Sequence, residues 1–256
     1  MTHEEKRIYL IKALLAERPA YGNIAIPDGV SEQKDLLRSL MNVRLPAPLS
    51  DEYIKIESDY LKKEAELKGI TRISGLKPVK PGLYIWRGDI TALECDAIVT
   101  AADPGMLGCF YPLHDCVDNL VHSAAGLRLR NYCSEIMKKQ GHAEQPGGAK
   151  LTPAFNLPCR YVIHTVGPMV NVCFNKAFKE QLASCYRSCL ALAEKHGCEN
   201  IAFCCISAGE LEAPQLRAAE TAVSTVTEYI KNGGKIDVIF TVLTEADRKI
   251  YKKLLK

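Results

Sequence analysis

The first 75 residues combine many charged side chains with apolar residues that recur every three or four positions. That spacing predicts three helices, over about residues 4–17, from about residue 31 onward, and over about residues 51–67. We expect Pro19 to stop the first helix. Ser50 is suited to cap the third, because its hydroxyl can accept a hydrogen bond from a free backbone N–H of the first turn. Residues 1–75 are therefore expected to form a compact helical extension.

After residue 75 the pattern changes to short, nearly continuous apolar runs separated by amphipathic stretches. These predict strands at residues 83–86, 96–101, 161–166, 200–206 and 236–242, and helices at residues 178–196 and 214–231. A further helix is expected to begin near Asp118, and Thr244 is expected to cap the last one. Continuous apolar strands suit a parallel sheet that is covered on both faces. Residues 76–256 are therefore expected to form a three-layer α/β/α domain.

Composition and charge narrow the possible partners and location. Of the 256 residues, 47% are hydrophobic and 25% are charged, which is enough for a packed core. The formal net charge of +3, without a basic stripe, argues against DNA binding, and no apolar stretch is long enough to predict a membrane span. The charged start does not resemble a signal peptide. We therefore expect the eleven cysteines to be reduced thiols of a cytoplasmic protein.

The segment GCFYPLHDC places Cys109, His114 and Cys116 within eight residues. Thiolate and imidazole are the ligands that zinc prefers, and the spacing C-x4-H-x-C lets one loop fold back on a single ion. Three protein ligands leave a fourth position open, as in zinc sites that bind water or substrate. From the spacing alone, a loop with two buried thiols and an ordinary histidine remains an alternative.

Two carboxylates and one loop are further candidates for chemistry. Asp118 precedes Asn119 at the start of an expected helix, where a carboxylate is also a common capping charge. Asp89, in WRGDIT, follows a strand and could equally be a turn former. The segment CCISAGELEAP runs from an expected strand into a helix, which is where α/β proteins often bind phosphate. None of these features decides a function by itself.

Taken together, the segments WRGDIT, DAIVTAAD, VDNLVHSAAG, YVIHTVGP and CCISAGELEAP, in this order, resemble the macrodomain family. The zinc-containing branch of that family is matched more closely still, by the segment at residues 108–116 and by LLRSLMNVRLPAPLSDEYI in the extension. The resemblance implies an α/β/α macrodomain with a cleft for ADP-ribose and bound Zn²⁺. It also implies an activity, the hydrolytic removal of mono-ADP-ribose from proteins. Some members act beside a sirtuin-like transferase and a lipoyl-carrier protein.

The resemblance also assigns roles to individual positions. Zinc is expected on Cys109, His114 and Cys116, near the distal ribose, and Asp118 is expected to act there with Asn119 and Asp103 beside it. The residues expected to contact ADP-ribose run along the whole cleft, from the adenine to the diphosphate and the distal ribose. They are Asp89, Ile90, Ala102, Asp103, Ser207, Ala208, Gly209, Glu210 and Leu211.

Three of these positions depart from the family pattern. Asp103 stands where an asparagine is usual, and an ionised carboxylate can only accept hydrogen bonds. Asp103 could instead reach the zinc as a fourth, oxygen ligand. Ala208 and Leu211 replace the usual threonine and aromatic residue of the phosphate turn. Two alternatives therefore stay open: a non-catalytic protein that only binds ADP-ribose, and a hydrolase of a small ADP-ribose ester.

Overall fold

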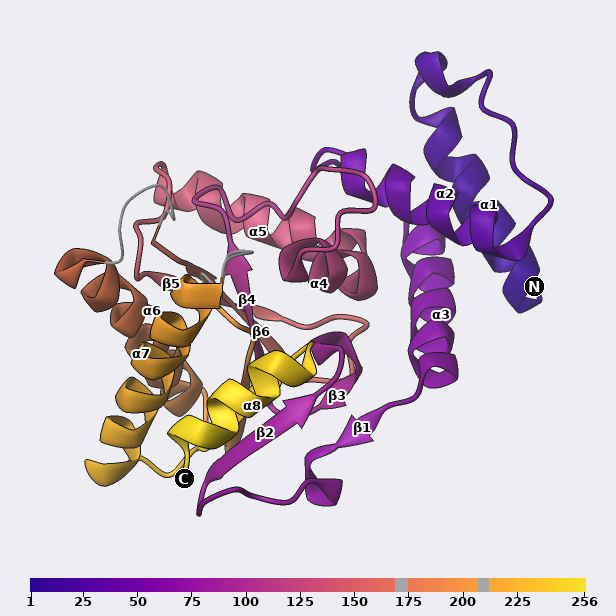
Figure 1. Cartoon of the computed structure of the whole chain (residues 1–256). Coiled ribbons are helices and arrows are strands. Elements are labelled where there is room, and N and C mark those ends of the chain that lie inside the picture. The colour runs from indigo at the N-terminus through magenta and orange to yellow at the C-terminus, as the bar shows by residue number, and fades with distance from the viewer. Residues whose placement is uncertain (169–174, 207–211) are drawn as a thin grey trace.

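A computed structural model describes residues 1–168, 175–206 and 212–256. Figure 1 shows a helical unit at the N-terminus set beside an α/β unit. The N-terminal unit contains α1 (His3–Ala16), the 3-10 turn η1 (Pro19–Tyr21), α2 (Val30–Val43) and α3 (Asp51–Lys68). A short connection, β1 (Thr71–Arg72) and η2 (Ile73–Gly75), leads from α3 into the α/β unit.

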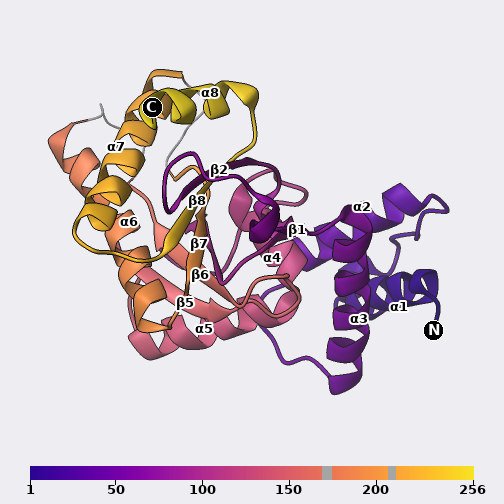
Figure 2. The ribbon, with the colours of Figure 1, turned by 90° about the horizontal axis from the view of Figure 1, so that it is seen from below.

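The α/β unit alternates strands with helices, as the sequence pattern predicts. Its first part contains β2 (Leu83–Arg87), η3 (Ile90–Ala92), β3 (Leu93–Glu94), β4 (Ala97–Ala102), α4 (Val117–Ala125) and α5 (Leu127–Gln140). Its second part contains β5 (Ala149–Pro153), β6 (Tyr161–Val166), α6 (Lys176–Lys195), β7 (Asn200–Phe203), α7 (Glu212–Lys231), β8 (Asp237–Val242) and α8 (Glu245–Leu254). Figure 2 shows α6 and α7 on one side of the sheet and α4 on the other, which confirms the three-layer α/β/α fold.

The three helices of the extension pack around an apolar core of their own. The cap of α3 forms as expected, since the Ser50 hydroxyl accepts a hydrogen bond from the Tyr53 backbone N–H at 3.1 Å. The buried residues of this core are Leu10, Ile11, Leu14, Leu37, Leu40, Met41, Tyr53, Ile56, Tyr60 and Leu127. Because Leu127 belongs to α5, the extension shares its core with the α/β unit and packs directly on it.

The main sheet is mixed, which corrects the expectation of a parallel sheet. Among the described residues its strands follow the order β2-β8-β7-β4-β6-β5. All neighbours are parallel except β5, which pairs antiparallel with β6 at the edge. The sequence pattern did not predict β5, because an edge strand is only half-covered and lacks a continuous apolar run. Pro153 ends β5, and an edge strand tolerates proline because one side needs no ladder hydrogen bonds.

Two element boundaries also differ from the expectation. The strand predicted at residues 200–206 ends at Phe203, where its pairing with both β4 and β8 stops, so Cys204 and Cys205 leave the sheet. Helix α7 begins at Glu212, two residues before Pro214. Proline is tolerated in a first helical turn because the backbone N–H groups there have no acceptor within the helix.

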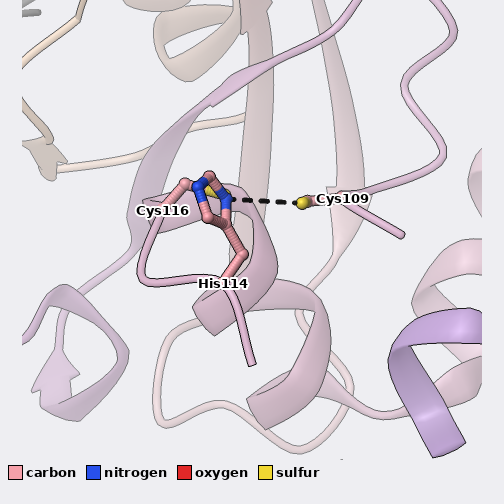
Figure 3. A group of neighbouring side chains, drawn as sticks. All are labelled: Cys109, His114 and Cys116. Carbon is pink, nitrogen blue, oxygen red and sulfur yellow. Dashed lines mark hydrogen bonds between the residues drawn. The ribbon is translucent and has the colours of Figure 1, made fainter. Parts of the chain in front are cut away.

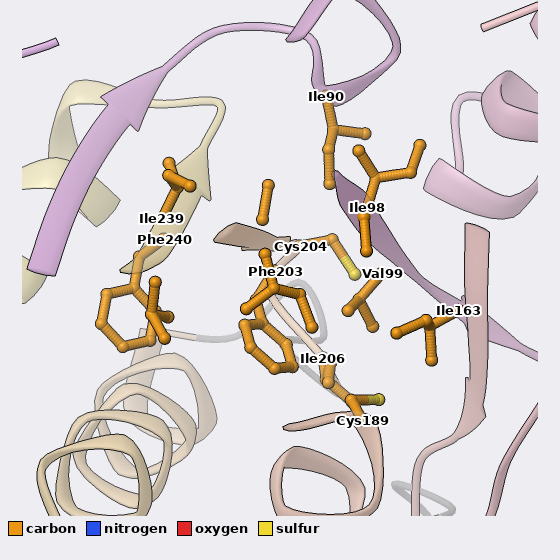
Figure 4. Packing of buried hydrophobic residues seen from close by; sticks show 14 of the residues in the cluster. Ile90, Ile98, Val99, Ile163, Cys189, Phe203, Cys204, Ile206, Ile239 and Phe240 are labelled. Carbon is orange, nitrogen blue, oxygen red and sulfur yellow. The ribbon is translucent and has the colours of Figure 1, made fainter. Parts of the chain in front are cut away.

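The core of the α/β unit lies between the central strands and the helices on either face. Figure 4 shows Ile98, Phe203 and Phe240, from β4, β7 and β8, among the buried side chains. All the cysteines that the structure describes are free thiols, and several of them fill this core. Within the described ranges, no helix is both long and apolar enough to cross a membrane.

The order of the strands places a ligand site at their carboxyl ends. Strands β4 and β7 are neighbours at the centre of the sheet. After β4 the chain continues into strands on one side of this pair, and after β7 it continues into β8 on the other side. Open α/β sheets bind ligands at such a reversal, outside the carboxyl ends of the strands. In this protein those ends are Ala102 and Phe203.

Candidate functional site

A cavity of about 420 Å³ opens beyond the carboxyl ends of β2, β7 and β8, where the sheet meets the start of α4. It brings together three residues that the sequence analysis singled out, namely Asp89, Ile90 and Cys116. Val117 and Leu120 of α4 and Cys204 after β7 complete much of its apolar wall. Cavities of this size and polarity suit small-molecule ligands. A second cavity of about 480 Å³, between α2, α3 and α4, shares only Leu120 with the first.

Asp89 lies at the entrance to η3 with its carboxylate held in place. Its Oδ1 accepts hydrogen bonds from the backbone N–H and the hydroxyl of Thr91, both at 2.8 Å, and its Oδ2 pairs with the Lys68 ammonium of α3. Burial alone would raise the pKa of Asp89, but the hydrogen bonds from Lys68 and Thr91 outweigh it and hold the pKa below its ordinary value. The Asp89 carboxylate is therefore ionised at neutral pH and can accept hydrogen bonds. It also caps η3, in agreement with the turn-forming role that its position predicted.

The side chains of Cys109, His114 and Cys116 converge as their spacing predicts (Figure 3), although residues 111–115 between the two cysteines are exposed. Their ligand atoms all lie within 4.8 Å of one another, and the Cys109 Sγ is 3.5 Å from the His114 Nδ1. Burial, with a smaller contribution from the neighbouring Cys109, raises the pKa of the Cys116 thiol to about 11. A divalent cation would reverse this effect, because metals bind the thiolate. The donor set and its geometry fit a zinc ion.

Asp118 sits in the first turn of α4, only 5% exposed. Burial and, to a smaller extent, the negative charge of Asp103 together raise its pKa to about 7. The Thr100 hydroxyl, 3.4 Å from the Asp118 Oδ1, and the charge of Arg130 act in the opposite direction. The structure thus brings two of the three expected catalytic residues, Asp118 and Asp103, close enough to interact electrostatically.

Asp103 itself shapes the turn that follows β4. It is exposed, and its Oδ1 accepts hydrogen bonds from the backbone N–H groups of Gly105, at 2.7 Å, and Met106, at 2.9 Å. It does not belong to the cluster of zinc-ligand candidates. Ala102 is the last residue of β4, beside this turn. The predicted phosphate contacts Ser207, Ala208, Gly209, Glu210 and Leu211 lie outside the described residues.

Residues 99–222 match the family model described as Macro domain. A protein of Treponema medium named protein-ADP-ribose hydrolase is 49% identical to this chain over 260 residues, which covers 100% of both chains. The chain belongs to the macrodomain family.

This macrodomain is also similar to a solved structure, the Trypanosoma brucei macrodomain in complex with ADP-ribose. The TM-score is 0.65 and the identity 31%, over 86% of this chain and 95% of that one. A protein of Fusarium oxysporum f. sp. cubense is named a probable bifunctional ADP-ribose hydrolase/ADP-ribosyltransferase. It is 39% identical over 241 residues, which cover 86% of this chain and 40% of the fungal protein.

Asn119 of this macrodomain is fully buried, and its amide is already engaged within the protein. Its Nδ2 donates to the carbonyl oxygens of Tyr111, at 2.9 Å, and Cys109, at 3.4 Å, while its Oδ1 accepts from Arg38 at 2.9 Å. These contacts assign Asn119 a role in holding the loop. A direct catalytic role, expected from the resemblance, stays a prediction. The sequence does not by itself predict a contact for Arg38, which stands in the motif LLRSLMNVR of the extension.

A second group of metal-binding residue types, His122, Cys133 and His164, is wholly buried, and the His122 Nε2 lies 3.8 Å from the Asp118 Oδ1. Burial lowers the pKa of His164 to about 4 and that of His122 well below its ordinary value, so both rings are neutral. The His122 ring packs against Gly108, where an added Cβ would lie 2.6 Å from a ring carbon. The glycine that precedes Cys109 therefore lets the loop of residues 109–116 approach α4 closely.

Proposed function

We propose that this macrodomain is a zinc-dependent hydrolase that removes mono-ADP-ribose from modified proteins. The observation that carries the proposal is the convergence of Cys109, His114 and Cys116 at the edge of a cleft that also contains Asp89. Cys116 belongs to both groups, so a metal held there would lie beside any ligand in the cleft. The Treponema medium relative, which matches over its full length and is named protein-ADP-ribose hydrolase, supports the hydrolysis of protein-linked ADP-ribose.

The cleft suits the two ends of ADP-ribose differently. At one end, the ionised Asp89 carboxylate can accept a hydrogen bond from the adenine amino group, beside the apolar Ile90. At the other end, Cys116 lines the cleft as the N-cap of α4, and the buried Asp118 follows in the first turn of that helix; the distal ribose and its anomeric carbon would lie near them. The Trypanosoma brucei macrodomain in complex with ADP-ribose supports this choice of ligand.

Hydrolysis breaks the bond between the anomeric carbon and the modified side chain, and a water oxygen takes the place of that side chain. When bound, zinc supplies a Lewis acid that polarises a substrate oxygen or lowers the pKa of a water. The residues of the chain must then orient the water and accept or return its proton. We assign this task to the Asp118 carboxyl, whose Oδ1 accepts a hydrogen bond from the Thr100 hydroxyl at 3.4 Å.

The partner enzyme and the target protein that we propose rest on the resemblance and on one relative. The fungal relative, whose name combines a hydrolase with an ADP-ribosyltransferase, supports a partnership with a transferase, for which we propose the sirtuin-like type. A lipoyl-carrier protein is the target we propose. The free thiols of the described cysteines suit a reducing compartment, and we place the protein in the cytoplasm.

The test combines metal content and turnover on the same purified sample. The wild type should hold about one zinc per chain and release ADP-ribose from a mono-ADP-ribosylated protein. Cys109→Ala and Cys116→Ala should lose both properties and keep the circular dichroism spectrum. The control Cys159→Ala, at a cysteine outside the cluster, should keep both.

Three outcomes would change the assignment. Full release by a zinc-free Cys109→Ala/Cys116→Ala double variant would overturn the dependence on zinc. A zinc-loaded wild type that binds ADP-ribose without releasing any would make this macrodomain a non-catalytic binder. Release from a small ADP-ribose ester, but not from the modified protein, would assign the ester as substrate.

A further inference from the structure

We propose that the helical extension holds the metal-binding loop, residues 109–116, in position, and that Arg38 of α2 is the positioning residue through which it does so. The inference deepens the proposed function, since it concerns how the loop with Cys109, His114 and Cys116 is held ready for a metal. The supporting observations are hydrogen bonds between side chains of the extension and the loop of residues 109–116. They join a helix near the N-terminus to a loop about 80 residues later in the chain.

Arg38 reaches the loop with two nitrogens of its guanidinium group. Its Nη2 donates to the carbonyl oxygen of His114 at 2.8 Å and to the Oδ1 of Asn119 at 2.9 Å. Its Nε donates to the same Oδ1 at 3.3 Å. A guanidinium group presents these donors in a rigid, planar fork, so the two acceptors are fixed relative to each other. Arg38 thereby joins the backbone of His114 to α4, the helix that Cys116 caps.

Asn119, which Arg38 contacts, in turn forms hydrogen bonds with both cysteines. Its side-chain Nδ2 donates to the carbonyl oxygen of Cys109 at 3.4 Å, and its backbone N–H points to the Sγ of Cys116, also at 3.4 Å. The pair of Arg38 and Asn119 therefore contacts all three residues that would bind the metal. The same Nδ2 also donates to the Tyr111 carbonyl in the middle of the loop.

One turn further along α2, Asn42 supports the same loop. Its Oδ1 accepts a hydrogen bond from the Leu113 backbone N–H at 3.1 Å, and its Nδ2 donates to the Ser123 hydroxyl of α4 at 3.0 Å. Leu113 has a φ of +57°, a left-handed conformation that a leucine adopts only when its surroundings enforce it. Asn42 thus supplies an outside contact to the strained residue directly before His114.

The end of α2 is in turn locked to the α/β unit by Arg130 of α5. The Arg130 Nη1 donates to the carbonyl oxygens of Met41, Asn42 and Arg44, at 2.7 to 2.9 Å. These carbonyls lie at the helix end, where they lack partners within the helix. Arg130 also donates to the Leu107 carbonyl at 2.7 Å, at the start of the loop. Arg130 therefore binds both the end of α2 and the start of the loop.

The loop depends on these contacts because it has little internal structure. The residues from Tyr111 to Asp115 are exposed, and the backbone hydrogen bond within the loop joins His114 to Tyr111 at a long 3.3 Å. Partners that orient metal ligands from outside the coordination sphere typically change metal affinity by roughly 10- to 100-fold. Loss of the Arg38 contacts is expected to weaken zinc binding by about that factor.

The first experiment compares Arg38→Met with Lys12→Met, a control at an exposed residue of α1. Zinc affinity is measured by competition with a chromophoric chelator, and stability of the metal-free protein by urea denaturation. Arg38→Met should bind zinc roughly 10- to 100-fold more weakly with a nearly unchanged urea midpoint, and Arg38→Lys should fall in between, since an ammonium lacks the fork. Lys12→Met should match the wild type. Wild-type affinity in Arg38→Met would overturn the proposal.

A second readout does not depend on zinc. In metal-free protein, the alkylation rates of Cys109 and Cys116 are followed by peptide mass spectrometry, with Cys159 as the internal reference. Arg38→Met should speed alkylation of the two loop cysteines several-fold and leave Cys159 unchanged. Faster alkylation of all three would indicate general loosening and would refute a positioning role. A wild type that takes up no zinc would sink the zinc assignment, while this measurement still tests Arg38.

Asn42→Ala is the second variant, for the case that Arg38→Met does not fold. It removes one hydrogen bond to the loop and one to Ser123, and it is expected to shift both readouts in the same direction. Unchanged zinc affinity and unchanged alkylation in Asn42→Ala would then overturn the role of the extension.

Discussion

Glu57 of α3 is a buried carboxyl group that should make the stability of this macrodomain fall as the pH rises. Its side chain is fully buried where the extension meets α5. The Oε1 accepts a hydrogen bond from the Leu127 backbone N–H at 3.1 Å, while the buried Oε2 has no partner among the described residues. Burial raises the pKa of Glu57 to about 7, although the Leu127 N–H and the charges of Arg128 and Arg44 oppose this.

The direction of the effect follows from where the proton is held. Below the ordinary pKa of 4.5, Glu57 is neutral in both the folded and the unfolded state. Between 4.5 and about 7 the folded protein keeps a proton that the unfolded chain has lost, so the free energy of unfolding falls as the pH rises. Above pH 7 the loss is complete, at about 3 kcal/mol.

Glu57→Gln removes this dependence, because an amide of nearly the same shape does not ionise. Urea denaturation of both proteins is measured from pH 5 to pH 8 with a chelator present, since metal binding has its own pH dependence. The variant should gain about 2 to 3 kcal/mol relative to the wild type across this range. Other titrating groups, Asp118 included, are common to both proteins and cancel in the difference.

Glu66→Gln, at an exposed residue of the same helix paired with Lys63, is the matched control. Its difference from the wild type should stay within ~0.5 kcal/mol at every pH. An equally flat difference for Glu57→Gln would refute the reasoning, because it would mean that burial at this interface does not perturb the carboxyl group.

Gly108→Ala is expected to destabilise the protein by about 2 kcal/mol or more, because the new Cβ would lie 2.6 Å from the His122 ring at a φ of +79°. Wild-type stability in urea would contradict this close approach. Leu10→Ala, in the core of the extension, should cost about 2–5 kcal/mol, and exposed Lys12→Ala less than ~0.5 kcal/mol; equal urea midpoints would argue against a packed extension. Asp118→Asn should lower kcat by roughly 100-fold or more while ADP-ribose affinity stays near that of the wild type. Undiminished turnover would remove Asp118 from the mechanism.

The local pattern of the sequence was enough for most elements of the fold. Helical spacing predicted the helices of the extension, and apolar runs predicted β2, β4, β6 and β8 to within a residue or two. These predictions succeed because an amphipathic helix and a strand buried on both faces each leave a repeat that neighbouring residues reveal. The short spacing of Cys109, His114 and Cys116 likewise predicted that they can converge, because one loop of eight residues carries all three.

Other features were decided only by tertiary structure. The antiparallel strand β5 and the end of β7 depend on which strands pair, and that is not written in either segment alone. Arg38 meets Asn119 across 81 residues, and Glu57 meets Leu127 across 70. Such contacts, and the pKa shifts that follow from burial, arise only when distant segments exclude water together. The sequence by itself therefore determined the layers and the metal-binding residue types, while the packing of the extension against α4 and α5 decided how the site is held.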